Sequence, residues 1–131
     1  MSIPTKAVKG IILNKEKELL LLQRNPNQYG TDVWDLPGGL IDHGEKEEDA
    51  LIRETREELS VNIIIKEKSK KWSFIRLGDE KEVVVQNYIC QIIDGDIKLS
   101  EEHKDYKWAK LENIKQYRVK NDSFYKSLEN L

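Results

Sequence analysis

The sequence predicts an α+β fold, or a β-sheet sandwiched between helices, within a single domain spanning residues 1–131. Two observations indicate this class. Runs of β-branched and apolar residues, typical of strands, recur along the chain between turns marked by Gly, Pro and Asn. Only two clear helical segments, 47–59 and 123–131, have apolar residues spaced to fall on one side. The order is therefore strands, one helix, more strands and a second helix.

The first forty residues are predicted to form three strands. Ile3–Leu13 combines alternation with β-branched residues, and Glu18–Arg24 follows after a polar turn. We expect these two strands to pair as a hairpin. Val33–Leu40 is predicted to be one short strand that ends in a Pro-Gly-Gly turn, where Gly38 and Gly39 let the backbone approach a ligand closely.

The segment Glu47–Leu59 is predicted to be the main helix. At about 100° per residue, Glu54, Glu57 and Glu58 fall within an arc of about 100°, beside an apolar stripe that can face a core. Like charges at this spacing repel each other, and hard divalent cations such as Mg²⁺ bind oxygen ligands of this type. The cluster is therefore a candidate metal site. The alternative is an ordinary solvated face, because 35% of the residues are charged.

The second half of the chain is predicted to contain four strands, a short helical turn at Leu111–Tyr117 and a C-terminal helix at Ser123–Leu131. The C-terminal helix would place Phe124, Leu128 and Leu131 on one side. The predicted strands are Val61–Ile65, Trp72–Leu77, Lys81–Ile93 and Tyr106–Ala109.

Charge and cysteine content restrict the class of protein. The net charge of -2 argues against non-specific nucleic-acid binding, which needs a basic face. The lysine-rich run 66–71 is predicted to be a solvated loop, or else a funnel for an anionic substrate. Cys90 lies in an apolar run, so we expect a buried free thiol in a reducing compartment. The longest apolar run, Leu19–Leu22, is too short to cross a membrane, and we expect a cytoplasmic protein.

The stretch Gly39–Val61 resembles the Nudix box, whose pattern is Gly-x5-Glu-x7-Arg-Glu-U-x-Glu-Glu-x-Gly-U, with U an apolar residue. Every charged position of the pattern is kept. Thr55 stands where an aliphatic residue is usual, and Ser60 stands where the family has Gly. A left-handed Ser would cost on the order of 1 kcal/mol, so we expect the helix end to adjust. The residues in register are Gly39, Glu45, Arg53, Glu54, Glu57, Glu58 and Val61.

This resemblance implies a fold and a metal site. The fold would be a Nudix-type α/β/α sandwich, in which a mixed β-sheet is flanked by helices. The metal ligands would be Glu54, Glu57 and Glu58, together with the carbonyl oxygen of Gly38. The implied cofactor is Mg²⁺, with Mn²⁺ as the alternative ion.

The resemblance also implies catalytic roles. Glu54 and Glu57 would act in catalysis, and Arg53 would orient a carboxylate of the box through a bidentate pair. The general base varies within this family between a Glu of the box and a Glu on a later loop. Glu101 and Glu102 occupy such a loop here, and we assign the base to Glu102. The alternative is that both are ordinary loop charges.

Candidate substrate contacts lie outside the box. Arg24 and Arg76 could bind phosphates, and Trp34 and Phe74 could stack on a base, although aromatic residues more often belong to the core. The two histidines have no further His or Cys at a ligand spacing, so we expect no zinc site there.

Together these features predict Mg²⁺-dependent hydrolysis of a phosphoanhydride in a nucleoside diphosphate linked to another group, X. The expected partner is a small-molecule nucleotide: first a nucleoside triphosphate, giving a monophosphate and pyrophosphate, and next an ADP-sugar. The alternatives are a catalytically silent nucleotide-binding or sensor domain and an RNA 5′-end pyrophosphohydrolase. An isopentenyl diphosphate isomerase is disfavoured, because no Cys precedes Gly39. We expect a monomer or a homodimer.

Overall fold

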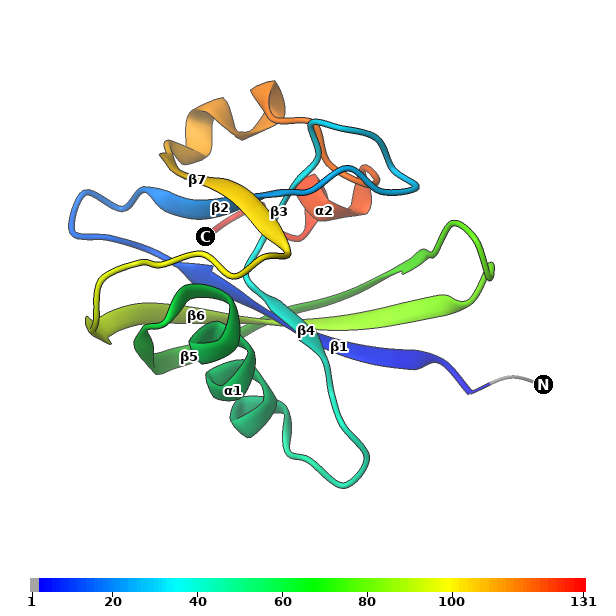
Figure 1. Cartoon of the computed structure of the whole chain (residues 1–131), viewed down its shortest axis with the longest axis horizontal. Coiled ribbons are helices and arrows are strands. Elements are labelled where there is room, and N and C mark those ends of the chain that lie inside the picture. The colour runs from blue at the N-terminus through cyan, green and yellow to red at the C-terminus, as the bar shows by residue number, and fades with distance from the viewer. Residues whose placement is uncertain (1–2) are drawn as a thin grey trace.

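The computed structural model describes residues 3–131, whose strands form two β-sheets (Figure 1). The larger sheet is mixed, because β1 runs parallel to β6 and antiparallel to β4. Its order is β4 (Gly38–Leu40), β1 (Thr5–Ile12), β6 (Glu82–Asp94) and β5 (Asn62–Ile75). The smaller sheet has the order β3 (Trp34–Asp35), β2 (Leu19–Arg24) and β7 (His103–Ala109).

Helices lie on both sides of these sheets (Figure 1). The helix α1 (Glu47–Leu59) covers the four-stranded sheet, and the core between them includes Cys90, a buried free thiol as predicted. The 3₁₀ helix η1 (Leu111–Gln116) packs by the three-stranded sheet, and the short helix α2 (Ser123–Lys126) contacts β5 through Phe124 and Trp72. Both lie around a second core that includes Phe124. The expected mixed sheet flanked by helices is confirmed. Within residues 3–131, no helix has both the length and the apolarity needed to cross a membrane.

The second strand belongs to the other sheet, so the predicted hairpin is wrong. β2 pairs with β3 and β7, and it meets the end of the first strand only at a single bridge between Leu13 and Leu19. The turn redirects the chain, because the amide oxygen of the Asn14 side chain accepts a hydrogen bond from the backbone N–H of Glu18 at 2.9 Å. Leu19–Leu22 is buried on both faces, which explains why this run shows no alternation.

The segment Val33–Leu40, predicted as one strand, is two strands in different sheets. β3 ends at Asp35 in the three-stranded sheet, and β4 begins at Gly38 in the four-stranded sheet. The two residues between them make the crossing, and Pro37 has no N–H with which to continue a ladder. The chain therefore passes from one sheet to the other at the point where the functional residues described below gather.

The predicted strands Val61–Ile65 and Trp72–Leu77 are parts of one strand, β5, which lies at the edge of its sheet. The lysine-rich run 66–71 is therefore strand and not loop. Register shifts against β6 within and around this run bend the strand, and they hide its alternation in the sequence. Lysines on an edge strand discourage pairing with another chain, which gives the run a structural role.

The ends of three elements differ from expectation. α1 has the predicted bounds, but Ser60 after it takes the left-handed conformation (φ 59°, ψ 33°), so the helix end does not adjust. Its N–H donates to the carbonyl of Arg56 at 3.0 Å and satisfies one acceptor of the last turn. α2 stops at Lys126, and the turns after it bury Leu128 but leave Leu131 44% exposed. β7 begins three residues earlier than predicted.

Candidate active site

Arg53 holds the acidic side chains of α1 and of the preceding loop in place. Its Nε donates to Glu45 Oε2 at 2.9 Å and its Nη2 to Glu45 Oε1 at 3.0 Å, a bidentate pair. Its Nη1 donates to Glu54 Oε1 at 3.0 Å and to Glu57 Oε1 at 3.3 Å. The hydrogen bonds from Arg53 lower the pKa of Glu45. One guanidinium therefore orients three carboxylates.

Gly38 and Gly39, where the chain turns into β4, pack directly on the acidic face of α1. A Cβ on Gly39 would lie 2.6 Å from the carboxylate carbon of Glu54, so any larger residue would force this carboxylate to move. Gly38 has φ +139°, and a Cβ there would lie 2.1 Å from the carbonyl oxygen of Val8. The backbone N–H of Gly38 donates to Glu58 Oε1 at 2.8 Å. The turn thus sets the positions of two carboxylates.

Glu58 is the most buried of the three predicted ligands on α1, with 5% of its surface exposed. Burial raises the pKa of Glu58 to about 8, and burial also raises the pKa of Glu54. A buried carboxylate is stabilised by taking either a proton or a cation. The atoms that these carboxylates offer to a metal are all oxygens, so the residues present fit a hard divalent cation such as Mg²⁺.

The loop between β6 and β7 adds a further carboxylate. Glu58, Glu102 and His103 each offer one ligand atom, and these atoms lie within 4.8 Å of one another. Backbone hydrogen bonds fix the loop: the N–H of Ser100 donates to the Glu58 carbonyl at 3.0 Å, and the N–H of Asn25 to the Glu102 carbonyl at 3.2 Å. Burial, with help from nearby cations, lowers the pKa of His103 to about 4, so its imidazole is neutral.

These groups open into a cleft of about 380 Å³ where the two sheets meet. Glu54, Glu58 and Glu102 line it together with both glycines of the turn. Glu57 does not line the cleft; its side chain is 58% exposed and is held by Arg53 on the outer face of the helix. The cleft therefore receives two of the three predicted ligands on α1 and also the predicted base.

Three of the four predicted substrate contacts also line the cleft. Arg24, Phe74 and Arg76 do so, although Arg76 is paired with a neighbouring aspartate. Trp34 lies in the core, is 9% exposed and packs edge-on against another aromatic ring at 5.4 Å. Side chains alternate along a strand, so Asp35, the next residue of β3, faces the cations of the cleft instead.

Sequence reasoning missed Lys9 and Lys120, which line the same cleft as Arg24, and also missed the buried Asp35 that pairs with these cations. Asp35 is 4% exposed, and its Oδ2 lies 3.2 Å from Lys9 Nζ, 3.4 Å from Lys120 Nζ and 3.7 Å from Arg24 Nη1. Although burial alone would raise the pKa of Asp35, these three cations hold it well below its usual range. A possible signal was a charged residue standing alone within a short apolar segment.

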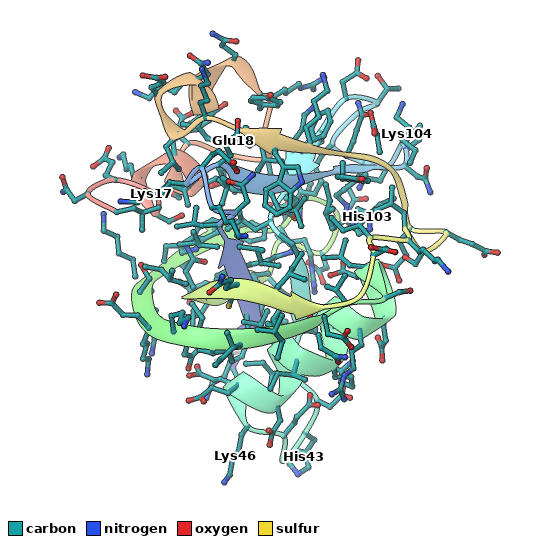
Figure 2. The ribbon with its side chains drawn as sticks, turned by 90° about the vertical axis from the view of Figure 1, so that its left-hand side faces the viewer. Lys17, Glu18, His43, Lys46, His103 and Lys104 are labelled. Carbon is teal, nitrogen blue, oxygen red and sulfur yellow. The ribbon has the colours of Figure 1, made fainter. Side chains whose placement is uncertain are left out.

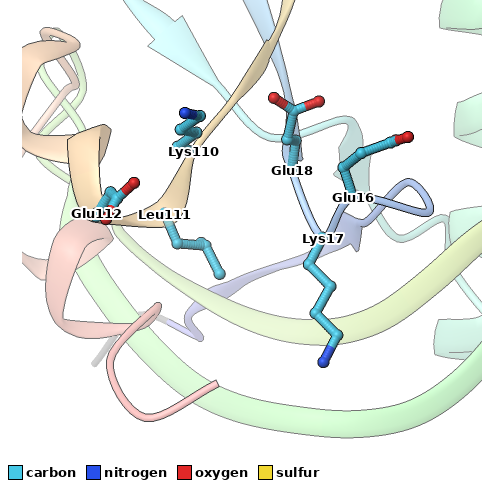
Figure 3. A pocket seen from close by; sticks show the side chains of 6 residues that line it. All are labelled: Glu16, Lys17, Glu18, Lys110, Leu111 and Glu112. Atoms are coloured by element: carbon cyan, nitrogen blue, oxygen red, sulfur yellow. The ribbon is translucent and has the colours of Figure 1, made fainter.

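Other polar groups of the surface lie apart from this cleft. Figure 2 shows His43 at the lower end of the molecule and His103 near its mid-height, so the two histidines do not share a site. A separate hollow of about 470 Å³ lies between the β1–β2 turn and the start of η1. Figure 3 shows the side chains that line it. Its lining mixes both charge signs on exposed residues such as Lys17 and Lys110, with no carboxylate from α1.

The two sheets and the carboxylate-lined cleft define an α+β protein suited to binding a divalent cation. A family model described as the NUDIX domain matches residues 4–128, and the chain therefore belongs to this family. Its resemblance to the Nudix box and the Nudix-type fold are thus confirmed.

Individual relatives agree with this assignment. The chain is 36% identical over 94 residues to the nucleoside triphosphatase NudI of Escherichia coli O81 (strain ED1a), a match that covers 64% of this chain and 66% of that protein. It is 28% identical over 123 residues to an ADP-ribose pyrophosphatase of Methanocaldococcus jannaschii, covering 94% and 72%. The crystal structure of the MutT protein from Methanosarcina mazei Go1 is similar with a TM-score of 0.85 and 30% identity, covering 98% and 94%. The chain spans just under two thirds of the NudI relative's length.

Proposed function

We propose that the protein is a Mg²⁺-dependent pyrophosphohydrolase that cleaves a phosphoanhydride in a nucleoside diphosphate linked to another group. The observation that supports this most is that Glu54, Glu58 and Glu102 line one cleft. Burying carboxylates together is unfavourable. Contacts from Arg53, Gly38 and Gly39 nevertheless hold Glu54 and Glu58 in the cleft. All four Glu of the box are kept, which favours an enzyme over a silent binding or sensor domain.

The proposed ligands are Glu54 and Glu58 in the cleft, the carbonyl of Gly38, and Glu57 at the outer face of the helix. When bound, Mg²⁺, or Mn²⁺ in its place, would neutralise phosphate charge and favour deprotonation of water. Glu102 would accept the proton of the attacking water, because its exposed loop position leaves it accessible. The water oxygen then bonds to phosphorus, and the bridging P–O bond breaks with its electron pair on the leaving phosphate.

The substrate that we favour is a nucleoside triphosphate. Relatives named nucleoside triphosphatase support this choice, and a relative named ADP-ribose pyrophosphatase supports an ADP-sugar as the second candidate. Arg24 and Arg76 would contact phosphates and Phe74 would contact the base, since all three line the cleft. We also propose a cytoplasmic location, in keeping with the free, buried thiol of Cys90.

A nucleotide panel tests this proposal. The protein is incubated with Mg²⁺ and each of the nucleoside triphosphates, ADP-sugars and dinucleoside polyphosphates, and released phosphate and pyrophosphate are measured separately. We expect nucleoside monophosphate and pyrophosphate from at least one triphosphate, with activity abolished by EDTA. Binding of Mg²⁺ and nucleotides without cleavage of any compound would favour the sensor-domain alternative.

A further inference from the structure

One carboxylate oxygen forms ion pairs with three cations in the cleft, of which Lys9 is buried and Arg24 and Lys120 are partly buried. Asp35 Oδ2 is the partner of Lys9 at 3.2 Å, Lys120 at 3.4 Å and Arg24 at 3.7 Å. The other oxygen of Asp35 accepts the backbone N–H of Leu36 at 2.8 Å. We call Lys9, Arg24, Asp35 and Lys120 the cationic cluster; its formal charges are three positive and one negative.

The described residues give the excess positive charge no second acidic partner, although Lys9 Nζ also donates to the backbone carbonyl of Leu36 at 3.3 Å. Within residues 3–131, every ion pair made by Lys9, Arg24 and Lys120 is with Asp35. The side chains are only 10%, 31% and 18% exposed, respectively, and the buried Nε of Arg24 has no hydrogen-bond partner. Burial and the neighbouring cations lower the pKa of Lys120, against the opposing effect of Asp35. Buried cations in this state are stabilised by a further anion.

The three cations face the same space as the carboxylates. Lys9, Arg24 and Lys120 all line the 380 Å³ cleft that Glu54, Glu58 and Glu102 line. Among the described residues no ion pair joins the two groups, so neither group neutralises the other by contact. Lysine and arginine side chains are donors only, and a ligand group placed among them must therefore present acceptor oxygens. Phosphate oxygens meet this requirement best, because they also carry charge.

We propose that the cationic cluster is an anion subsite that binds a phosphate of the substrate beyond the two phosphates held at the carboxylates. The proposal rests on the function proposed above and narrows its substrate class. A compound with three or more consecutive phosphates fills both subsites, whereas a nucleoside diphosphate linked to an uncharged group fills only one. Lys120 is the cation chosen for the test, because its ammonium lies 5.4 Å from the rings of Tyr29 and Phe74, which also line the cleft.

Binding of inorganic triphosphate to the full chain in EDTA tests the subsite without any hydrolysis. Isothermal titration calorimetry would compare the wild type, Lys120→Met, and Lys104→Met as a control on an exposed lysine (labelled in Figure 2). We expect Lys120→Met to weaken binding by about tenfold or more, since it removes a charged hydrogen-bond donor, and Lys104→Met to leave it unchanged. Lys120→Arg keeps the charge and should restore most of the affinity.

Further measurements separate the outcomes. The melting temperature of ligand-free Lys120→Met should equal or exceed that of the wild type, because repulsion within the cluster is relieved. With Mg²⁺, the variant should lose more in kcat/KM for a nucleoside triphosphate than for the matching diphosphate.

Equal triphosphate binding by wild type and Lys120→Met would overturn the subsite. An effect of Lys120→Met on binding of a nucleoside alone would also overturn it, because that result would indicate base recognition. Calorimetry in EDTA measures triphosphate binding without hydrolysis. A failure of the proposed function would therefore appear only in the hydrolysis assays, and a failure of the subsite would appear in the binding assay.

Discussion

The acidic and the cationic parts of the cleft are built in opposite ways. In the acidic part, one guanidinium of Arg53 forms ion pairs with four carboxylates, which all come from α1 and the loop before it. In the cationic cluster, one carboxylate of Asp35 contacts three cations that come from β1, β2 and the segment after η1. Each part therefore carries an excess of one charge, and the two excesses have opposite signs.

This difference shows what each part lacks. The excess carboxylates are stabilised by a divalent cation, and the excess ammonium and guanidinium groups are stabilised by an anion. A polyphosphate bound with Mg²⁺ supplies both in one ligand. The predictions below alter one part at a time, so that the two halves of this account are tested separately.

Loss of the single counter-charge in the cationic cluster is expected to have the largest effect. Asp35→Asn leaves one buried and two partly buried cations without an anion and should lower the free energy of unfolding by about 3 kcal/mol at pH 7. Urea denaturation would measure this, with the exposed Asp96→Asn as control. If Asp35→Asn were as stable as the control, the cluster would not depend on Asp35.

The same variant has a predicted pH dependence. The pKa of Asp35 is lower in the folded protein than its usual value, so its contribution is fully present above about pH 4 and is lost as the pH falls through the folded pKa. The stability difference between wild type and Asp35→Asn should therefore be constant from pH 5 to 7, approximately, and shrink below about pH 4. A difference that persisted unchanged into acid would contradict the pairing.

In the acidic part, Glu58→Gln should lower kcat by at least about a hundredfold, because a metal ligand stabilises charge in the transition state. In EDTA its melting temperature should equal or exceed that of the wild type, since a neutral amide relieves the burial of a carboxylate. Glu48→Gln, on the exposed first turn, is the matched control. Glu57→Gln should lower kcat by a similar factor. Normal turnover by Glu57→Gln would restrict the metal ligands to the residues that line the cleft.

A methyl group on the glycine turn should disturb the acidic part alone. Gly39→Ala places a Cβ 2.6 Å from the carboxylate carbon of Glu54, so the side chain must move, and kcat should fall by about tenfold. Gly10→Ala is the control, because its Cβ would meet neighbours at an ordinary 3.5 Å. Full activity of Gly39→Ala would mean that the position of Glu54 is not critical.

The smallest effect is expected just beyond the acidic helix. Ser60 keeps a left-handed conformation, and Ser60→Gly should raise the free energy of unfolding by up to about 1 kcal/mol with little change in activity. Thermal and urea unfolding would both report it. A clear loss of stability would show that the hydroxyl makes a favourable contact that outweighs the backbone strain.

The same contrast explains how much could be predicted from the sequence. The helix Glu47–Leu59 and its carboxylates were predictable, because helical spacing is local and the box is contiguous. The cationic cluster was not, because Lys9, Asp35 and Lys120 meet only after the chain crosses between sheets. No local pattern records which distant strand ends become neighbours.

Two errors in the fold have similar causes. β2 is buried on both faces, so its sequence is an apolar run with no alternation between apolar and polar residues. The strands with which it pairs could therefore not be deduced. β5 contains register shifts that break its alternation, and its lysines therefore resembled a loop. In both strands tertiary context, which local propensity does not contain, decided the structure.

Hydrolysis in ¹⁸O-labelled water tests the central claim most directly. A nucleoside triphosphate is incubated with the protein and Mg²⁺, and the products are analysed by ³¹P NMR and mass spectrometry. The account predicts one ¹⁸O atom on one of the two phosphates that flanked the cut anhydride. Glu58→Gln should incorporate ¹⁸O at no more than about one hundredth of the wild-type rate. Labelling by Glu58→Gln at the wild-type rate, or no labelling by a wild-type protein that binds both Mg²⁺ and the nucleotide, would contradict it.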